Sequence, residues 1–199
     1  MMANHFEKWL SNHQSAVVNM LPGRFWILEK KIAKTVRALR KRITLNCFER
    51  VPKVMWESVP WQRNPAYVDL NCYAGKYADF SYPKQGPAFS WADYCGTPKA
   101  TEIAAFTKAI RKGDIVYVTF YLIPRFRESI DEDCAPALSG PMPKRAERLA
   151  CVLESIIKKK IGDNFTRILF SSYINGEGKR GASPMVTVGW HFKKGSALA

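Results

Sequence analysis

The chain has 199 residues, of which 47% are apolar and 24% are charged. These proportions are typical of a globular protein and exclude a disordered one. No apolar run approaches the ~18–20 residues of a membrane span, and residues 1–8 lack the basic-then-apolar pattern of a secretory signal. We therefore expect a protein of the cytoplasm, or of the inside of a host cell, without a membrane partner.

The charge balance is strongly basic. Lys and Arg number 31 against 17 Asp and Glu, which gives a formal net charge of +14. Such a surface attracts polyanions, and nucleic acid is the abundant polyanion in a cell. The charge therefore predicts a nucleic-acid partner, DNA or RNA, although a basic surface can also serve solubility alone.

Cysteine and histidine spacing does not indicate a metal site. The five cysteines include no CxxC pair, and the three histidines show no metal-ligand spacing. We expect reduced, mostly buried thiols and no bound metal.

Apolar patterning in the first half of the chain predicts strands alternating with helices. Residues 3–15 are predicted to form a short polar helix or a tail, so that residues 1–15 stand apart from a single domain at 16–199. Pro22-Gly23 ends the first strand, and apolar residues three or four positions apart define the helix that follows. The predicted elements are a strand at 16–21, a helix at 28–43, a strand at 43–48, a short helix at 52–56 and a strand at 67–72.

The second half continues the alternation and ends in a hairpin. Residues 115–123 are nearly all apolar, which is typical of a parallel strand covered on both faces. A Pro-rich connection at 124–143 follows it. The last two strands are joined by a short loop, so they pair as an antiparallel hairpin that adds one antiparallel strand at an edge. The predicted elements are a strand at 88–93, helices at 101–112 and 144–161, and strands at 115–123, 166–174 and 184–192.

This order predicts an α/β fold: a mostly parallel, Rossmann-like sheet with helices on both faces and a C-terminal antiparallel hairpin. Three sequence features follow strand ends: the turn at 19–25 with its single Gly23, the acidic residue Glu49, and the segment Asp93-Tyr94-Cys95-Gly96-Thr97-Pro98. Ligands of such sheets bind at the carboxyl ends of the strands. We therefore expect the carboxylates of Glu49 and Asp93 at a common edge.

The element order and these three features resemble class I S-adenosylmethionine-dependent methyltransferases, over about residues 16–192. The resemblance implies S-adenosylmethionine as the cofactor. In the family, the turn after the first strand lies under the methionine part of the cofactor, and an acidic residue ending the second strand binds the ribose hydroxyls. The cofactor-binding residues implied are Asn19, Leu21, Pro22, Gly23 and Glu49.

The segment after the fourth predicted strand is similar to the catalytic loop of methyltransferases that act on base amines. The resemblance implies that Asp93 accepts a hydrogen bond from the amine and that Tyr94 stacks on a flipped base. Cys95 is either a nucleophile for carbon methylation or a buried thiol.

Basic residues supply the predicted nucleic-acid contacts. They lie on the predicted helix at 27–42 and in the hairpin loop, where phosphates require no regular geometry. The loop at 176–181 matches G-x-G-x-x-G but precedes a strand, so it is a hairpin loop rather than a dinucleotide cradle. The predicted contacts are Lys34, Arg37, Lys41, Lys179 and Arg180; Lys158–Lys160 form either a further stretch of this path or a solvated helix end.

Two hypotheses follow, with a third behind them. The first is methyl transfer from S-adenosylmethionine to a nucleic acid, with a base amine as the acceptor. The second is a catalytically inactive relative that serves as a basic nucleic-acid-binding or structural subunit; the single glycine of the turn and the lack of Pro-Pro after Asp93 motivate it. The third is a different parallel-sheet enzyme, because fold alone does not determine function.

Overall fold

The computed structural model describes residues 2–20, 27–49, 66–74, 87–94, 96–123, 130–175 and 183–193, without the side chains of residues 2, 3, 27–30, 49, 74, 109 and 175. Within them, seven strands form a mostly parallel sheet in the order β3-β2-β1-β4-β5-β7-β6. The chain divides into two compact units, residues 1–91 and 92–199, with the boundary inside β4.

The first unit is built on parallel strands. They are β1 (Ser15–Met20), β2 (Arg42–Glu49), β3 (Val68–Ala74) and the start of β4 (Ala88–Asp93). β1 pairs in parallel with both β2 and β4, and β2 pairs in parallel with β3. The apolar side chains of β1 and β2 are buried, which agrees with the apolar runs that predicted these strands.

The N-terminal residues form helix α1 (Met2–Ser11) rather than a tail. Phe6, Trp9 and Leu10 are buried, and the ring of Phe6 meets that of Phe89 edge-on at 5.0 Å between centroids. The sequence analysis judged this segment polar because its apolar residues are few. They lie on one helix face, however, and that face belongs to the core of the first unit.

Helix α2 (Ile27–Ala38) is shorter than the predicted helix at 28–43. Arg40 takes the left-handed conformation with φ 51°, and the N–H of Lys41 donates to the carbonyl of Val36 at 3.1 Å. This pattern is a Schellman motif, which ends a helix. Ile43, counted on the apolar face of the helix, therefore belongs to β2. The predicted helix at 52–56 lies outside the described residues.

The second unit contains the rest of the sheet: β5 (Ile115–Tyr121), β6 (Phe165–Asn175) and β7 (Ser183–Phe192). β7 runs antiparallel to both β5 and β6 and lies between them. The expectation that the antiparallel strand lies at an edge is therefore wrong. β7 is buried on both faces, whereas β6 exposes Phe170, Tyr173 and Ile174, and the less buried strand takes the edge.

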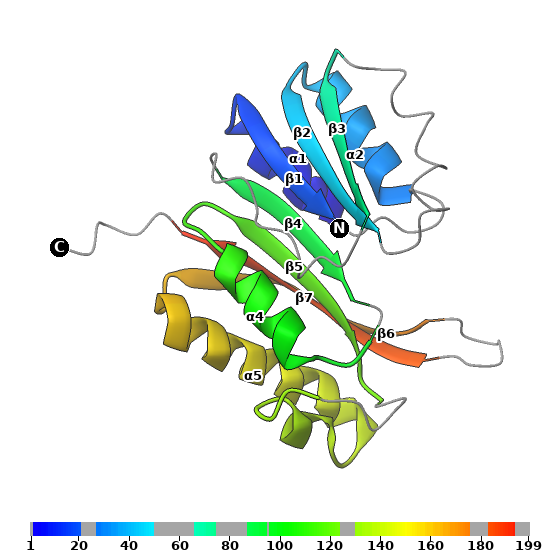
Figure 1. Cartoon of the computed structure of the whole chain (residues 1–199), viewed down its shortest axis with the longest axis vertical. Coiled ribbons are helices and arrows are strands. Elements are labelled where there is room, and N and C mark those ends of the chain that lie inside the picture. The colour runs from blue at the N-terminus through cyan, green and yellow to red at the C-terminus, as the bar shows by residue number, and fades with distance from the viewer. Residues whose placement is uncertain are drawn as a thin grey trace. The chain divides into compact units, whose positions relative to one another are not determined.

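Helices α4 (Ala100–Ala109) and α5 (Met142–Ile161) cover the same face of this part of the sheet (Figure 1). Both contact the buried Trp190 of β7: Phe106 of α4 stacks parallel to its ring, with 6.5 Å between centroids, and Glu154 of α5 accepts a hydrogen bond from its indole nitrogen. A 3-10 helix, η3 (Ala135–Leu138), precedes α5. None of the helices in the described residues is long and apolar enough to cross a membrane.

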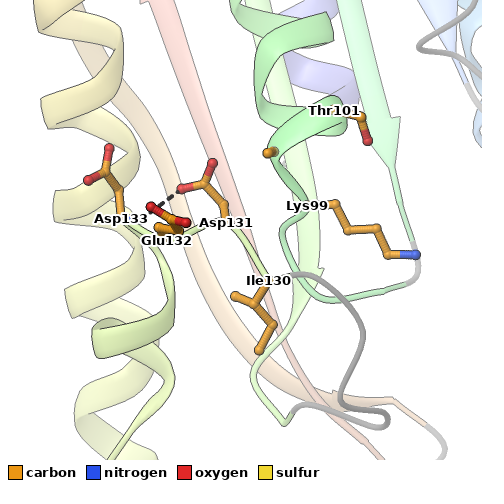
Figure 2. Close-up of a pocket in the computed structure, with 7 residues that line it drawn as sticks. Lys99, Thr101, Ile130, Asp131, Glu132 and Asp133 are labelled. Carbon is orange, nitrogen blue, oxygen red and sulfur yellow. Dashed lines mark hydrogen bonds between the residues drawn. The ribbon is translucent and has the colours of Figure 1, made fainter.

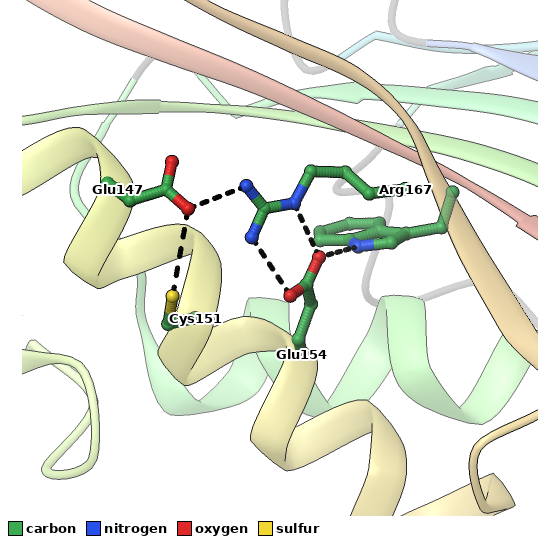
Figure 3. A network of polar contacts seen from close by, with 5 residues as sticks. Glu147, Cys151, Glu154 and Arg167 are labelled. Atoms are coloured by element: carbon green, nitrogen blue, oxygen red, sulfur yellow. Dashed lines mark hydrogen bonds and ion pairs between the residues drawn. The ribbon is translucent and has the colours of Figure 1, made fainter.

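A charged network fastens the hairpin to α5 (Figure 3). The guanidinium of Arg167 on β6 donates to both carboxylate oxygens of Glu154, at 2.6 and 2.9 Å, and to Glu147 at 2.7 Å. Burial alone raises the pKa of Glu154, but the hydrogen bonds from Arg167 and Trp190 outweigh it and hold that pKa below its ordinary value. The Glu154 carboxylate is therefore ionised and held by hydrogen bonds from both Arg167 and Trp190.

The cysteines are less buried than the sequence analysis expects. Of the four described, Cys47 and Cys134 are buried and Cys72 and Cys151 are exposed, and all four carry thiols rather than disulfides. Burial raises the pKa of Cys134 to about 12, so this thiol is unreactive. Cys95 lies outside the described residues.

Candidate active site

The residues predicted to bind the cofactor stand at the ends of β1 and β2. Asn19 is the penultimate residue of β1, and Glu49 is the last residue of β2, two positions beyond Cys47, the register partner of Met20. The turn residues Leu21, Pro22 and Gly23 and the side chain of Glu49 lie outside the described part of the structure. Their roles, and the expected approach of Glu49 to Asp93, stay predictions.

Asn19 belongs to a ladder of polar side chains across the first unit. The amide of Asn46 donates to the oxygen of Asn19 at 2.9 Å, and that of Asn71 donates to Asn46 at 3.0 Å. Asn19 in turn donates to the Ser90 hydroxyl at 3.3 Å. Asn19 and Asn46 are almost completely buried. The Asn19 side chain therefore has a structural task in the sheet, and its contact with a cofactor stays a prediction.

A pocket of about 340 Å³ in the first unit lies at the opposite end of these strands. Its lining includes Ser15, Arg42 and Asp69, which stand at or next to the amino ends of β1, β2 and β3. Arg42 donates two hydrogen bonds to the carboxylate of Asp69, at 3.0 and 3.1 Å. Since parallel sheets bind ligands at carboxyl ends, this pocket is not the candidate site.

The predicted catalytic residues lie where β4 ends in the second unit. Asp93 is the last residue of β4 and is half-buried. The ring of Tyr94 stacks on that of Phe120 at 5.2 Å between centroids, and its hydroxyl donates to the carbonyl of Glu102 at 3.3 Å. Tyr94 thus packs on its own protein, and its stacking on a base stays a prediction.

Backbone hydrogen bonds hold the segment after Tyr94 in place. The N–H of Tyr121, at the end of β5, donates to the carbonyl of Gly96 at 2.8 Å, and the N–H of Asp131 donates to that of Pro98 at 2.9 Å. The loop between β4 and α4 is therefore tied to the segment that follows β5. A fixed loop is what positioning of an acceptor requires.

These two segments enclose a pocket of about 550 Å³. Figure 2 shows Asp131, Glu132 and Asp133 on one side and Lys99 and Thr101, where α4 begins, on the other. Asp131 is itself fixed, because one of its carboxylate oxygens accepts the backbone N–H groups of Asp133 and Cys134, at 3.1 and 3.3 Å. The volume lies in the usual range of small-ligand sites.

The sequence analysis missed this pocket. Its acidic run, residues 131–133, falls in the connection at 124–143, which was noted only for its prolines. The available signal was three consecutive acidic residues in a basic chain, after a strand that is almost entirely apolar. Such a run indicates a site only when the fold brings a second segment beside it, and the sequence did not reveal that second segment.

Comparison with known proteins supports the fold. No protein-family model and no curated protein matches the chain. Similar solved structures include an rRNA methylase from Streptococcus thermophilus, with 12% identity, a TM-score of 0.50 and 96% of each chain covered. Another is M. jannaschii TYW2 in complex with AdoMet, with 11% identity, a TM-score of 0.51, and 96% of this chain and 74% of that one covered. A third is a SAM-dependent methyltransferase from Methanosarcina mazei, with 8% identity, a TM-score of 0.52, and 91% and 94% covered.

The chain has the class I methyltransferase fold.

In this methyltransferase fold, the predicted nucleic-acid contacts are only partly described. Lys34 and Arg37 are exposed on α2, and Lys41 is half-buried just after the helix. Lys179 and Arg180 lie outside the described residues. Exposure leaves the charges of Lys34 and Arg37 available to a polyanion but does not assign one.

The described part of the methyltransferase fold holds no group of three or more His, Cys, Asp or Glu side chains arranged to bind a metal ion. The acidic lining of the larger pocket, residues 131–133, belongs to this described part. Its carboxylates can act as hydrogen-bond acceptors.

Proposed function

We propose that this protein transfers a methyl group from S-adenosylmethionine to a nucleic acid, with a base amine as the acceptor. The observation that carries the proposal is the strand order β3-β2-β1-β4-β5-β7-β6, in which β2 ends on Glu49 and β4 on Asp93. A carboxylate at the end of the strand next to β1 suits the vicinal hydroxyls of a ribose.

The residues present are chemically suited to the cofactor. Glu49 would accept two hydrogen bonds from the ribose, and the turn of Leu21, Pro22 and Gly23 would let the backbone approach the methionine part. When bound, S-adenosylmethionine supplies a methyl group on a sulfonium, which is already a good leaving group. The protein's remaining task is to hold and orient the acceptor.

The acceptor side is suited to a group that donates N–H hydrogen bonds. Asp93 would accept one from the reacting amine. The pocket beside the β4–α4 loop is lined with three carboxylates and one lysine. Carboxylates repel phosphates but accept hydrogen bonds from exocyclic amines of bases. We therefore assign this pocket to a base rather than to a backbone phosphate.

Calorimetric titration with S-adenosylmethionine tests the cofactor. The wild type is expected to bind, and Glu49→Ala to raise Kd at least about tenfold, because hydrogen bonds to a charged group are worth roughly 1.5–3 kcal/mol. Glu7→Ala, which removes an exposed glutamate of α1, is the matched control and should bind like the wild type. Absence of heat with the wild type, or equal binding by Glu49→Ala, contradicts the proposal.

The acceptor role is tested in the same preparations with labelled cofactor and cellular RNA or DNA. Asp93→Ala is expected to lose methyl transfer while keeping its affinity for S-adenosylmethionine. Equal loss of both would make Asp93 a structural residue.

A catalytically inactive nucleic-acid-binding protein is the second candidate. The packing of Tyr94 on Phe120 favours it, because the ring is already engaged by its own protein. This candidate predicts salt-sensitive binding of nucleic acid and no methyl transfer by the wild type.

A further inference from the structure

A dense group of positive charges lies where α4 and α5 end in the second unit. Both helices carry lysines in their last turn, and basic residues continue into the segments that follow. We call this group the helix-end patch. It consists of Lys108, Arg111, Lys112, Lys158, Lys159, Lys160 and Lys193.

Several contacts bring these segments together. The Lys160 ammonium of α5 donates to the hydroxyl of Thr107 on α4 at 2.9 Å, which joins the two helix ends. The N–H of Gly113, in the turn after α4, donates to the carbonyl of Phe192 at 2.7 Å, and the N–H of Lys193 donates to that of Asn164 at 2.9 Å. These contacts therefore bring the segments that carry the patch close together and hold their backbone in place.

Few negative charges oppose the patch. Within residues 108–114, 158–165 and 190–193, the acidic residues are Asp114 and Asp163. Asp114 is buried and accepts the backbone N–H of Arg111 at 2.8 Å, while Asp163 pairs with Lys158 at 2.9 Å. Lys108, Lys112, Lys159 and Lys193 are exposed, so most of the positive charge faces solvent.

Helix stability alone does not account for this arrangement. Cations in the last turn of a helix stabilise it through the macrodipole, which explains lysines such as Lys108 and Lys158. Lys112 and Lys193 lie outside helices, in a turn and at the end of β7, where that effect does not reach. The helices and the turns around them thus add charge to the same surface.

The patch is separate from the pocket of the candidate site. The pocket lies at the first turn of α4, and the patch lies at its last turn and beyond. At 1.5 Å per residue, the ten residues of α4 place them about 15 Å apart.

We propose that the helix-end patch binds the phosphate backbone of a nucleic acid. Exposed lysines on fixed backbone match the regular negative charge of a phosphodiester chain and need no base contacts. Surfaces that bind membranes add exposed aromatic or leucine side chains, whereas the large exposed apolar residue within the described patch segments, 108–114, 158–165 and 190–193, is Ile161. The inference deepens the proposed function by assigning a surface to the nucleic acid: it rests on the nucleic-acid partner proposed there but not on methyl transfer.

The test uses fluorescence anisotropy with a labelled RNA hairpin and a DNA duplex of the same sequence. Lys112→Gln/Lys159→Gln removes two charges from the patch. Lys8→Gln/Lys144→Gln removes two exposed charges from elsewhere, so both variants have the same net charge. The patch variant is expected to reduce the slope of log Kd against log salt by about two and to weaken binding of at least one probe about tenfold; the control should stay close to the wild type.

Two results would overturn the inference. One is equal weakening by the patch and control variants, which would attribute binding to net charge. The other is binding of phosphatidylserine vesicles, lost in the patch variant, with no binding of either nucleic acid. Melting temperatures of both variants show that these surface changes leave the fold intact. Because the readout requires no cofactor, failure to bind S-adenosylmethionine would count against the proposed function and leave this inference standing.

Discussion

At the scale of single residues, the asparagine ladder shows how polar side chains are accommodated in a buried sheet, where each is hydrogen-bonded to the next. Asn46 is fully buried, donates to Asn19 and accepts from Asn71. Removing it leaves the buried side-chain oxygen of Asn19 without its donor, although Asn19 still donates to Ser90, and takes the acceptor from the exposed Asn71 amide. We expect Asn46→Ala to lower the free energy of unfolding by about 3 kcal/mol in urea denaturation. Asn71→Ala, which removes one hydrogen bond at the exposed end, should cost about 1 kcal/mol; equal costs would show that the ladder is not a unit.

Glu154 gives a second prediction at this scale. Its pKa is depressed in the folded protein, so its ionised form adds stability above the ordinary value of 4.5, and that stability is lost as the pH falls through the lower folded pKa. Glu154→Gln should cost about 2 kcal/mol near neutral pH, and less in acid, where the wild type has lost the same ion pair. Melting temperature against pH measures the difference, with the exposed Glu7→Gln as the control. A difference that does not shrink in acid contradicts the assignment.

At the scale of elements, β5 and β7 fit each other through one glycine. Gly189 is the register partner of Tyr117, and a Cβ built on it would lie 2.3 Å from two carbons of the Tyr117 ring. Both residues are in the core, so neither can move away cheaply. We expect Gly189→Ala to destabilise the protein by about 3 kcal/mol in thermal or urea unfolding.

Gly96→Ala is the control for that variant, because the Cβ there meets its nearest atom at an ordinary 3.6 Å. Combining Gly189→Ala with Tyr117→Val removes the ring that causes the clash. The double variant should therefore cost less than the sum of the two single changes. If the two losses in free energy of unfolding simply add, the strain in Gly189→Ala does not come from the Tyr117 ring.

At the scale of the whole molecule, patterning predicted the class of fold because it records burial. The apolar run of β5 and the spaced apolar residues of α5 report faces that the folded chain covers, and both elements lie where the sequence places them. The order of the two hairpin strands in the sheet was harder to predict, because an apolar pattern shows that a strand is buried but not which strands it pairs with. In the structure β5 pairs with β7 and not with β6, which places β7 inside the sheet and β6 at its edge.

The candidate site was less predictable than the fold. Strand ends located Glu49 and Asp93, since chain order alone puts them there. The packing of Tyr94 on Phe120 and the pocket formed with Asp131 depend on segments distant in sequence that meet through backbone hydrogen bonds. The residue types along one segment do not indicate which distant segment of the chain it will contact.

The edge position of β6 has a consequence for handling the protein. A long border strand with apolar side chains such as Ile174 can recruit strands from other chains, which begins aggregation. The register of β6 against β7 shifts between Arg167 and Leu169, and such irregularities bend a border strand and spoil it as a template. Arg167 adjoins that irregularity, and its ion pair with Glu154 ties the strand to α5. Purification should therefore use conditions that keep this irregular, ion-paired stretch of β6 intact. A regular edge strand would pair more readily with strands of other chains.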